Sequence, residues 1–279
     1  MEGKRDEDSE LEELAAEAAA EGKALEIDVE IREVTEDRGV AAYAAEFVGT
    51  FLLVLFICLI LTVAAALQGP DFVGFGAADF VLIGLLHFLV LAMLIYTLGG
   101  TSGAHFNPAV TATLAALRKI TPVDAVIYVL LQLSGAVAGA LVCKALLTDE
   151  VGAVDNGATA VNDALITNFG GFVFEVIGTF VLMWAIMGVA VNPRGHAEWA
   201  GLVIGGTLGF AVMTIGPLTG AGFNPARWFG PALVDGQWEQ AWLYILGPIV
   251  GALAAGFGYK AIVLDSQLAP SDRPIDKLP

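Results

Sequence analysis

The chain has 279 residues, of which 57% are hydrophobic and only 15% are charged. Soluble domains usually carry about a quarter charged residues, so this composition all but excludes a soluble enzyme and indicates a protein surrounded mostly by lipid. The net charge of −17 is concentrated in residues 1–40, where 15 acidic and five basic residues give −10, and no segment is basic enough to bind nucleic acid.

Residues 1–40 form the first segment, an acidic tail that we expect to be solvated. It does not resemble a signal peptide, which would begin with basic residues. Ser9 and Glu12 match a helix-capping box, and residues 25–32 alternate apolar and charged side chains as a strand does. Pairing of this tail with an unknown partner or a sister subunit is left open.

Six apolar runs follow that are long enough, or nearly so, to cross a bilayer, which requires about 20 apolar residues. They contain no Asp, Glu, Lys or Arg, and His87 is their only imidazole. Cys58 and Cys143 lie within apolar runs and are interpreted as packing residues, so no disulfide, metal site or cofactor is expected. The runs are Phe47–Leu67, Phe80–Leu98, Ala125–Cys143, Val176–Asn192, Trp199–Pro217 and Gln240–Tyr259.

Two further apolar stretches, Phe106–Leu117 and Ala221–Val234, are too short to cross, and Asn-Pro-Ala occurs near the start of each. A short segment in lipid must satisfy its backbone within protein or a wet cavity, which predicts two re-entrant half-helices. The loops near residues 68–79, 148–169 and 235–239 lack Lys and Arg. Both termini are therefore expected to be cytoplasmic, with Lys144 as the exception to the charge pattern.

The two halves of the chain repeat each other. EFVGTF at residues 46–51 recurs as EVIGTF at 175–180, and SGAHFNPA at 102–109 recurs as TGAGFNPA at 219–226. Each half holds three spans and one half-helix, so the second half must be inserted upside down. Inverted repeats of about 41–147 and 170–264 are predicted, followed by a cytoplasmic tail, 265–279. Paired interrupted helices in such repeats place the working site at the midplane.

The motifs SGAHFNPAVT and TGAGFNPARWFGPA, with AEFVGTFLLV near the start, resemble those of the aquaporin and glycerol-facilitator family across residues 41–264. The resemblance implies an all-α integral membrane protein of six transmembrane helices and two re-entrant half-helices. It implies a homotetramer in the cell membrane with one passive pore per protomer, not an enzyme. Water is the expected solute, with ammonia and some glycerol as further candidates, while protons and ions are excluded.

Three other functions are weighed against a water channel. A glycerol or polyol facilitator is the main alternative. A secondary transporter would need an ion-binding or titratable group at the midplane, where only His87 is available. A structural scaffold would have no need of two intact Asn-Pro-Ala motifs or of Arg227. Trp228 and Ile245 depart from the family pattern and leave the subfamily open.

Each Asn-Pro-Ala motif has a physical explanation. Asn is a favoured helix N-cap and Pro a favoured first helical residue, so each motif starts a half-helix whose Asn oxygen caps the backbone while its nitrogen donates to a passing solute. Two helix N-termini meeting at the midplane disfavour cations. The residues concerned are Asn107, Pro108, Ala109, Asn224, Pro225 and Ala226.

The remaining site residues come from the resemblance. His87, Val212, Ala221 and Arg227 align with the narrowest constriction, the selectivity filter of the family. Glu46 and Glu175 align with buried acids that orient the re-entrant loops. The loop residues expected to present carbonyl oxygens to the pore are Gly103, Ala104, His105, Gly220 and Gly222.

Overall fold

The computed structural model of the chain describes residues 38–69, 72, 74–147 and 156–267. The predicted acidic tail up to residue 37, and the second tail beyond Gln267, lie outside the described residues. Within the described part every regular element is helical, and six helices are long and apolar enough to cross a membrane. The predicted fold class is thereby confirmed.

Each of the six predicted apolar runs corresponds to one long helix, and with the adjoining π-helical and 3₁₀ turns the bounds cover each run to within one residue. The fourth long helix continues through a π-helical turn, η2 (Met187–Val191), and the sixth through another, η4 (Lys260–Leu264). A 3₁₀ turn, η3 (Ala197–Trp199), precedes the fifth long helix. A short helix, α10 (Asp265–Gln267), follows η4. The long helices are α2 (Val40–Leu67), α3 (Ala77–Ser102), α5 (Pro122–Leu146), α6 (Asn168–Ile186), α7 (Ala200–Thr219) and α9 (Ala241–Tyr259).

The two short apolar segments form α4 (Pro108–Ala116) and α8 (Pro225–Asp235). Each helix begins at its proline, with the preceding asparagine as N-cap in extended conformation. A proline at the first helical position loses no hydrogen bond, because that N–H has no partner within a helix. The Asn-Pro sequence therefore starts each half-helix in the middle of the protein.

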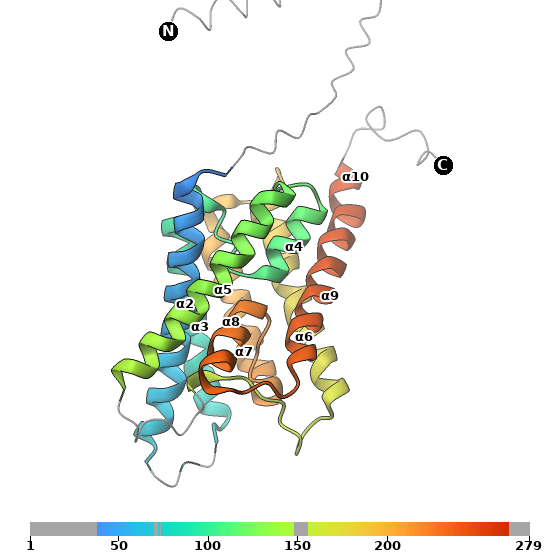
Figure 1. Ribbon diagram of the computed structural model, residues 1–279. Coiled ribbons are helices and arrows are strands. Elements are labelled where there is room, and N and C mark those ends of the chain that lie inside the picture. The colour runs from blue at the N-terminus through green and yellow to red at the C-terminus, as the bar shows by residue number, and fades with distance from the viewer. Residues whose placement is uncertain (1–37, 70–71, 73, 148–155, 268–279) are drawn as a thin grey trace, which may run out of the picture. The chain divides into compact units, whose positions relative to one another are not determined.

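The start of α2 and the end of α10 lie on the same side of the helix bundle, at the top of Figure 1. We call this the terminal side and the opposite one the distal side. The half-helix α4 lies toward the terminal side and α8 toward the distal side (Figure 1). The most extensive helix contacts within the halves join α2 with α5 and α6 with α9. Between the halves, the most extensive contact joins α3 with α7.

Glycines allow these helices to approach closely. A Cβ atom built at Gly139 of α5 would lie 2.6 Å from the carbonyl oxygen of Phe51 in α2, and one at Gly251 of α9 would lie 2.2 Å from that of Val176 in α6. Any side chain there would push the pair apart, as expected for small-residue stripes between membrane helices. The half-helices cross over between repeats, since α4 packs on α9 and α8 on α5.

Candidate channel site

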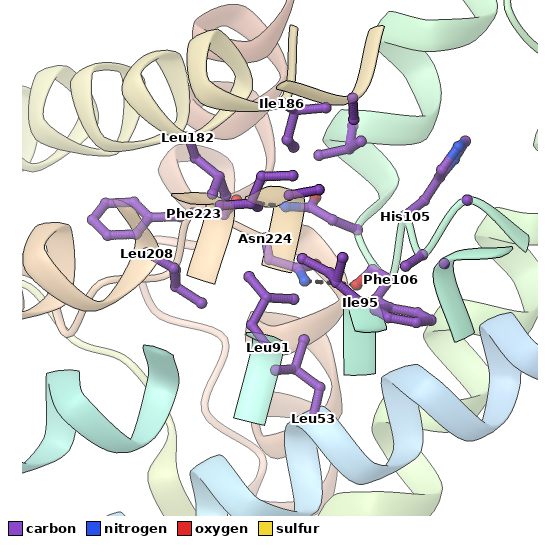
Figure 2. Close-up of a pocket in the computed structure, with 18 of the residues that line it drawn as sticks. Leu53, Leu91, Ile95, His105, Phe106, Leu182, Ile186, Leu208, Phe223 and Asn224 are labelled. Atoms are coloured by element: carbon purple, nitrogen blue, oxygen red, sulfur yellow. Dashed lines mark hydrogen bonds between the residues drawn. The ribbon is translucent and has the colours of Figure 1, made fainter. Parts of the chain in front are cut away.

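The N-termini of the two half-helices meet through their asparagine caps. Asn107 Oδ1 accepts a hydrogen bond from the Ala109 N–H at 2.9 Å, and Asn224 Oδ1 accepts from the Ala226 N–H at 2.9 Å. Each amide nitrogen donates to the opposite half: Asn107 Nδ2 to the Phe223 carbonyl at 2.9 Å and Asn224 Nδ2 to the Phe106 carbonyl at 2.8 Å (Figure 2).

These crossed bonds refine the expected role of the asparagines. The nitrogen was expected to donate to a passing solute, whereas its first partner is a backbone carbonyl of the other repeat. An amide nitrogen carries two hydrogens, so one remains after the crossed bond is made. Both asparagines line a cavity between the helices, which we call the central cavity, and the neighbouring Pro108, Ala109, Pro225 and Ala226 are buried.

Two buried glutamates hold the loops that precede the half-helices. Glu46 accepts hydrogen bonds from the N–H groups of His105 at 2.9 Å and Phe106 at 2.8 Å. Glu175 accepts in the same way from Gly222 at 2.9 Å and Phe223 at 2.6 Å. Both carboxyl groups are fully buried, and such groups require donors of this kind.

The direction of these N–H groups fixes the direction of the loop carbonyls. In a planar trans peptide the C=O points opposite to the following N–H. Because the N–H groups of His105 and Phe106 point at Glu46, the carbonyls of Ala104 and His105 point away from it. The second loop repeats the arrangement, so the carbonyls of Ala221 and Gly222 point away from Glu175. All four residues line the central cavity.

The loop backbone repeats as closely as its hydrogen bonds. Ala104 and Phe106 have φ of 51° and 47°, and their counterparts Ala221 and Phe223 have φ of 52° and 48°. Non-glycine residues seldom adopt positive φ, so the buried glutamates hold both loops in a conformation that the free chain disfavours. Gly103 and Gly220 begin the two loops, also with positive φ.

Two cavities share two of the four residues aligned with the filter, and each cavity is lined by one of the other two. The first is the central cavity, which has a volume of about 520 Å³ and extends from Arg38 and Lys119 on the terminal side to His87, Ala221 and Arg227. A second cavity of about 480 Å³ lies on the distal side and is lined by loop residues 74–76, 158 and 160–162, and by Val212. His87 and Arg227 line both cavities.

His87 presents an acceptor at this junction. Its Nδ1 lies 2.8 Å from the carbonyl oxygen of Ile83. A carbonyl can only accept, so Nδ1 carries the proton and donates it, an assignment from the hydrogen-bond network. The lone pair then lies on Nε2, which is buried and has no hydrogen-bond partner among the described residues.

Arg227 presents donors beside it. The guanidinium is 2% exposed, and Nη1 donates to the carbonyl oxygen of Gly157 at 2.7 Å. Nε is buried without a hydrogen-bond partner in the described part of the chain. A guanidinium group stays protonated in proteins even when it is buried, so the site keeps a positive charge at residues that line both cavities.

The wall opposite the polar loops is apolar. Leu53, Leu91, Leu182 and Leu208 project from α2, α3, α6 and α7 around the central asparagine, as Figure 2 shows. Beside these leucines, a solute therefore finds its hydrogen-bond partners on the side of the loops and the asparagines.

Sequence reasoning assigned no role to several residues that support the loops. A Cβ atom at Gly49 would lie 2.1 Å from the Phe106 ring, and one at Gly178 would lie 2.1 Å from the Phe223 ring. Both glycines lie in the repeated EFVGTF and EVIGTF motifs, so the repeat itself was the missed signal. Gln132 bonds Glu46 at 2.7 Å and Thr111 at 2.9 Å.

Trp228, the main departure from the family pattern, packs away from the pore. Its ring stacks on Tyr244, with centroids 6.2 Å apart and planes at 12°, and is 2% exposed. It lines neither cavity. The bulk of this side chain therefore leaves the junction of the cavities unchanged.

Comparison with known proteins agrees with this geometry. A profile of the major intrinsic protein family matches residues 33–259. The chain is 41% identical over 234 residues to the probable aquaporin AqpM of Archaeoglobus fulgidus, covering 78% of this chain and 94% of that protein. It is 39% identical over 222 residues to nodulin-26 of Glycine max, covering 78% of this chain and 76% of that protein.

Solved structures share the fold, and one of them illustrates the likeness. The X-ray structure of the aquaglyceroporin from Plasmodium falciparum superposes with a TM-score of 0.62, covering 79% of this chain and 97% of that one. The sequences are 23% identical, so this likeness concerns the arrangement of the helices.

Proposed function

Since the chain belongs to the major intrinsic protein family, and is thus a passive membrane channel for water and small solutes and not an enzyme, we propose that His87, Val212, Ala221 and Arg227 form its selectivity filter. The observation that carries the proposal is that His87 and Arg227 line both cavities, while Ala221 lines the first and Val212 the second.

The loops supply the path that leads to this filter. Their carbonyl oxygens accept hydrogen bonds from water molecules in single file. This is supported by the hydrogen bonds from loop N–H groups to Glu46 and Glu175, which turn loop carbonyls away from these carboxylates. The carbonyls are those of Gly103, Ala104, His105, Gly220, Ala221 and Gly222. The remaining amide hydrogen of each central asparagine donates to the water that passes it. Water then meets donors at the centre and acceptors on either side.

Protons and cations are excluded by positive charge at two levels. The two half-helix N-termini each contribute about half a positive charge at the centre, and Arg227 adds a full charge at the filter. Such half-helix dipoles and an arginine are the barriers expected of a pore of this type. The central asparagines also orient the passing water, which interrupts a relay of protons.

The side chains of the filter determine which solutes pass through the channel. Val212 and Ala221 leave a broad apolar side, while His87 Nε2 accepts and Arg227 donates hydrogen bonds on the other. We expect rapid water flux, measurable ammonia flux and slower glycerol flux. A glycerol facilitator is the second candidate, favoured by a relative of 37% identity named glycerol uptake facilitator protein-like 6 from Lactiplantibacillus plantarum.

The assembly and orientation belong to the same proposal. The protein forms a homotetramer in the cell membrane with the terminal side in the cytoplasm, supported by Arg118, Lys119 and Arg194, which lie in the loops on that side. Protease protection of a tag at the chain end in sealed cells tests the orientation, and mass measurement of the detergent complex tests the tetramer.

Light scattering on proteoliposomes tests the channel proposal. Shrinkage rates are measured with impermeant solute for water, with glycerol, and with an ammonium gradient read by an internal pH dye. Replacing Arg227 with Val should admit protons and cations while water flux persists. The proposal fails if the unmodified protein collapses a pH gradient as fast as a proton ionophore, or if glycerol flux equals water flux.

A further inference from the structure

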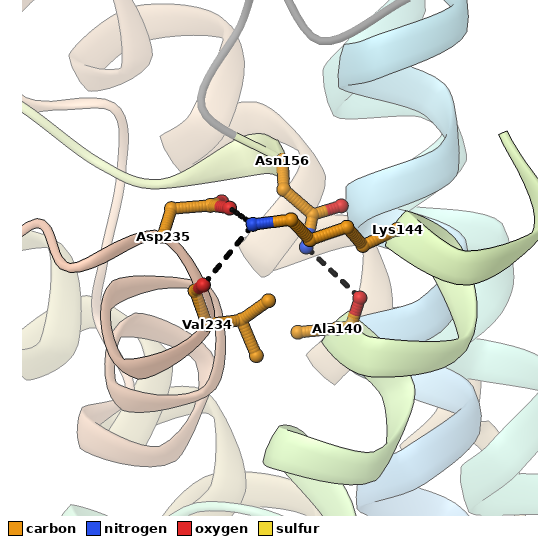
Figure 3. A network of polar contacts seen from close by, with 5 residues as sticks. All are labelled: Ala140, Lys144, Asn156, Val234 and Asp235. Carbon is orange, nitrogen blue, oxygen red and sulfur yellow. Dashed lines mark hydrogen bonds and ion pairs between the residues drawn. The ribbon is translucent and has the colours of Figure 1, made fainter. Parts of the chain in front are cut away.

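Lys144, the exception to the predicted charge pattern, has its partners on the half-helix that carries Arg227. Its Nζ donates to Asp235 Oδ1 at 2.8 Å and to the Val234 carbonyl at 3.2 Å (Figure 3). Both residues lie in the last turn of α8. The C-terminus of a helix is its negative end, so the ammonium group compensates both the helix end and the Asp235 carboxylate.

The segment that holds the Arg227 guanidinium is tied to the same turn of α5. Asn156 Nδ2 donates to the carbonyl oxygen of Ala140 at 2.9 Å (Figure 3). The next residue, Gly157, accepts the hydrogen bond from Arg227 Nη1. A Cβ atom at Gly157 would lie 3.1 Å from the Cα of Cys58 in α2, so this segment also packs closely on the bundle.

One turn of α5, from Ala140 to Lys144, thus contacts both supports of the filter arginine. Lys144 holds the end of α8, whose first turn carries Arg227, and Ala140 holds the segment whose carbonyl receives the guanidinium. We propose that Lys144 and Asn156 are positioning residues that set solute selectivity by fixing Arg227 in the filter. This inference rests on the proposed function of Arg227.

The repeat supports this assignment because, among the described residues, α8 receives such an ion pair at its last turn and α4 does not. At the offset of 116 residues that relates α5 to α9, Lys144 corresponds to Lys260, and at the offset of 117 that relates the half-helices, Asp235 corresponds to Arg118. Two cations cannot pair, and Lys260 instead binds Asp265 at 2.9 Å within its own helical segment. The half-helix that receives an ion pair from a long helix of the other half is therefore α8, which carries the filter arginine.

The two ion pairs make a matched comparison. Lys144 and Lys260 side chains are 54% and 50% exposed, and their N–O distances are 2.8 Å and 2.9 Å. Removing either lysine loses one partly exposed ion pair at the end of a membrane helix. Only the Lys144 pair reaches α8, so an effect on selectivity restricted to Lys144 reports positioning and not a general loss of stability.

The experiment compares Lys144→Met, Lys144→Arg and Asn156→Gly with Lys260→Met in the full chain. Glycine is chosen at 156 because the native φ is +48°. The readout is the ratio of glycerol to water permeability in proteoliposomes. Lys144→Met and Asn156→Gly should raise the ratio by about two- to fivefold, the size expected for losing a partly exposed pair. Lys144→Arg should restore the ratio, and Lys260→Met should leave it unchanged.

Salt provides a test that needs no variant. At about 1 M KCl on both sides of the membrane the Debye length falls to about 3 Å, so the wild-type ratio should rise toward that of Lys144→Met, whose own ratio should not change. The inference is overturned if the glycerol to water permeability ratio of the wild type does not change with salt and the ratio of Lys144→Met equals that of Lys260→Met.

Arg227→Val separates this inference from the proposal on which it rests. If Arg227→Val leaves the glycerol to water ratio unchanged, the filter assignment itself is wrong. If Arg227→Val raises the ratio while Lys144→Met and Asn156→Gly match Lys260→Met, the filter assignment stands and the positioning role is wrong.

Discussion

Gly49 and Gly178 offer a sharp test of how the re-entrant loops are seated. A Cβ atom at Gly49 would lie 2.1 Å from Cε1 of Phe106, and one at Gly178 would lie 2.1 Å from Cε1 of Phe223. Carbon atoms pack at about 3.5–4.0 Å, so each ring must move by more than about 1 Å. Overpacking of this kind costs about 1–3 kcal/mol, more than the roughly 0.5–1 kcal/mol that alanine gains over glycine within a helix.

The ring displacement should reach the centre of the pore. The carbonyl oxygen of Phe106 accepts the Asn224 amide at 2.8 Å, and a shift of about 1 Å breaks a hydrogen bond of that length. We therefore expect Gly49→Ala and Gly178→Ala to lower both the melting temperature and the water permeability.

Thermal unfolding in detergent and light scattering on proteoliposomes measure the two effects. Gly206→Ala in α7 is the matched control, since the nearest atom to its Cβ would be 4.0 Å away. It should be as stable as the wild type or more so. If Gly49→Ala has the same melting temperature and water permeability as Gly206→Ala, the packing of the Phe106 ring on Gly49 does not hold the loop in place, and the reasoning is refuted.

Three further predictions follow from the same contacts. Glu175→Gln places an amide donor against the Phe223 N–H, now 2.6 Å from the carboxylate, and should cost about 1.5–3 kcal/mol; an unchanged melting temperature would show that the carboxylate is not needed. Trp228→Phe should lower the melting temperature but leave the glycerol to water ratio unchanged, because the indole lines neither cavity; an altered ratio would contradict this placement. Val212→His should narrow the filter and suppress ammonia flux more than water flux, and equal flux of ammonia before and after the change would disprove the filter assignment.

The central asparagines show where a local pattern predicts a structure only in part. The Asn-Pro pair predicts a helix start, and the oxygens of Asn107 and Asn224 do cap α4 and α8. The nitrogens bond carbonyls that lie 116 and 118 residues away in the sequence. Capping is a property of three consecutive residues, whereas the crossed bonds exist only once the two repeats have packed together.

The helices of this protein and their starts can be derived from the amino-acid sequence alone. Apolar run length separated six spans from two half-helices, because the thickness of a bilayer fixes how many residues a crossing needs. The Asn-Pro-Ala repeat located the starts of α4 and α8, because capping and the fixed φ of proline act locally. Run length and helix capping both depend on residues that are close together in the chain.

How these helices and loops support one another depends on their packing in three dimensions. Periodicity and composition are the same for an apolar helix whichever neighbour it faces, so they did not reveal that Gly49 seats Phe106 or that Trp228 turns away from the cavities. Lys144 looked misplaced as a charge near the end of a span until packing brought Asp235 beside it. The contacts that hold the site join residues far apart in the chain, and their register is set by close packing of side chains, which a single sequence does not encode in any local pattern.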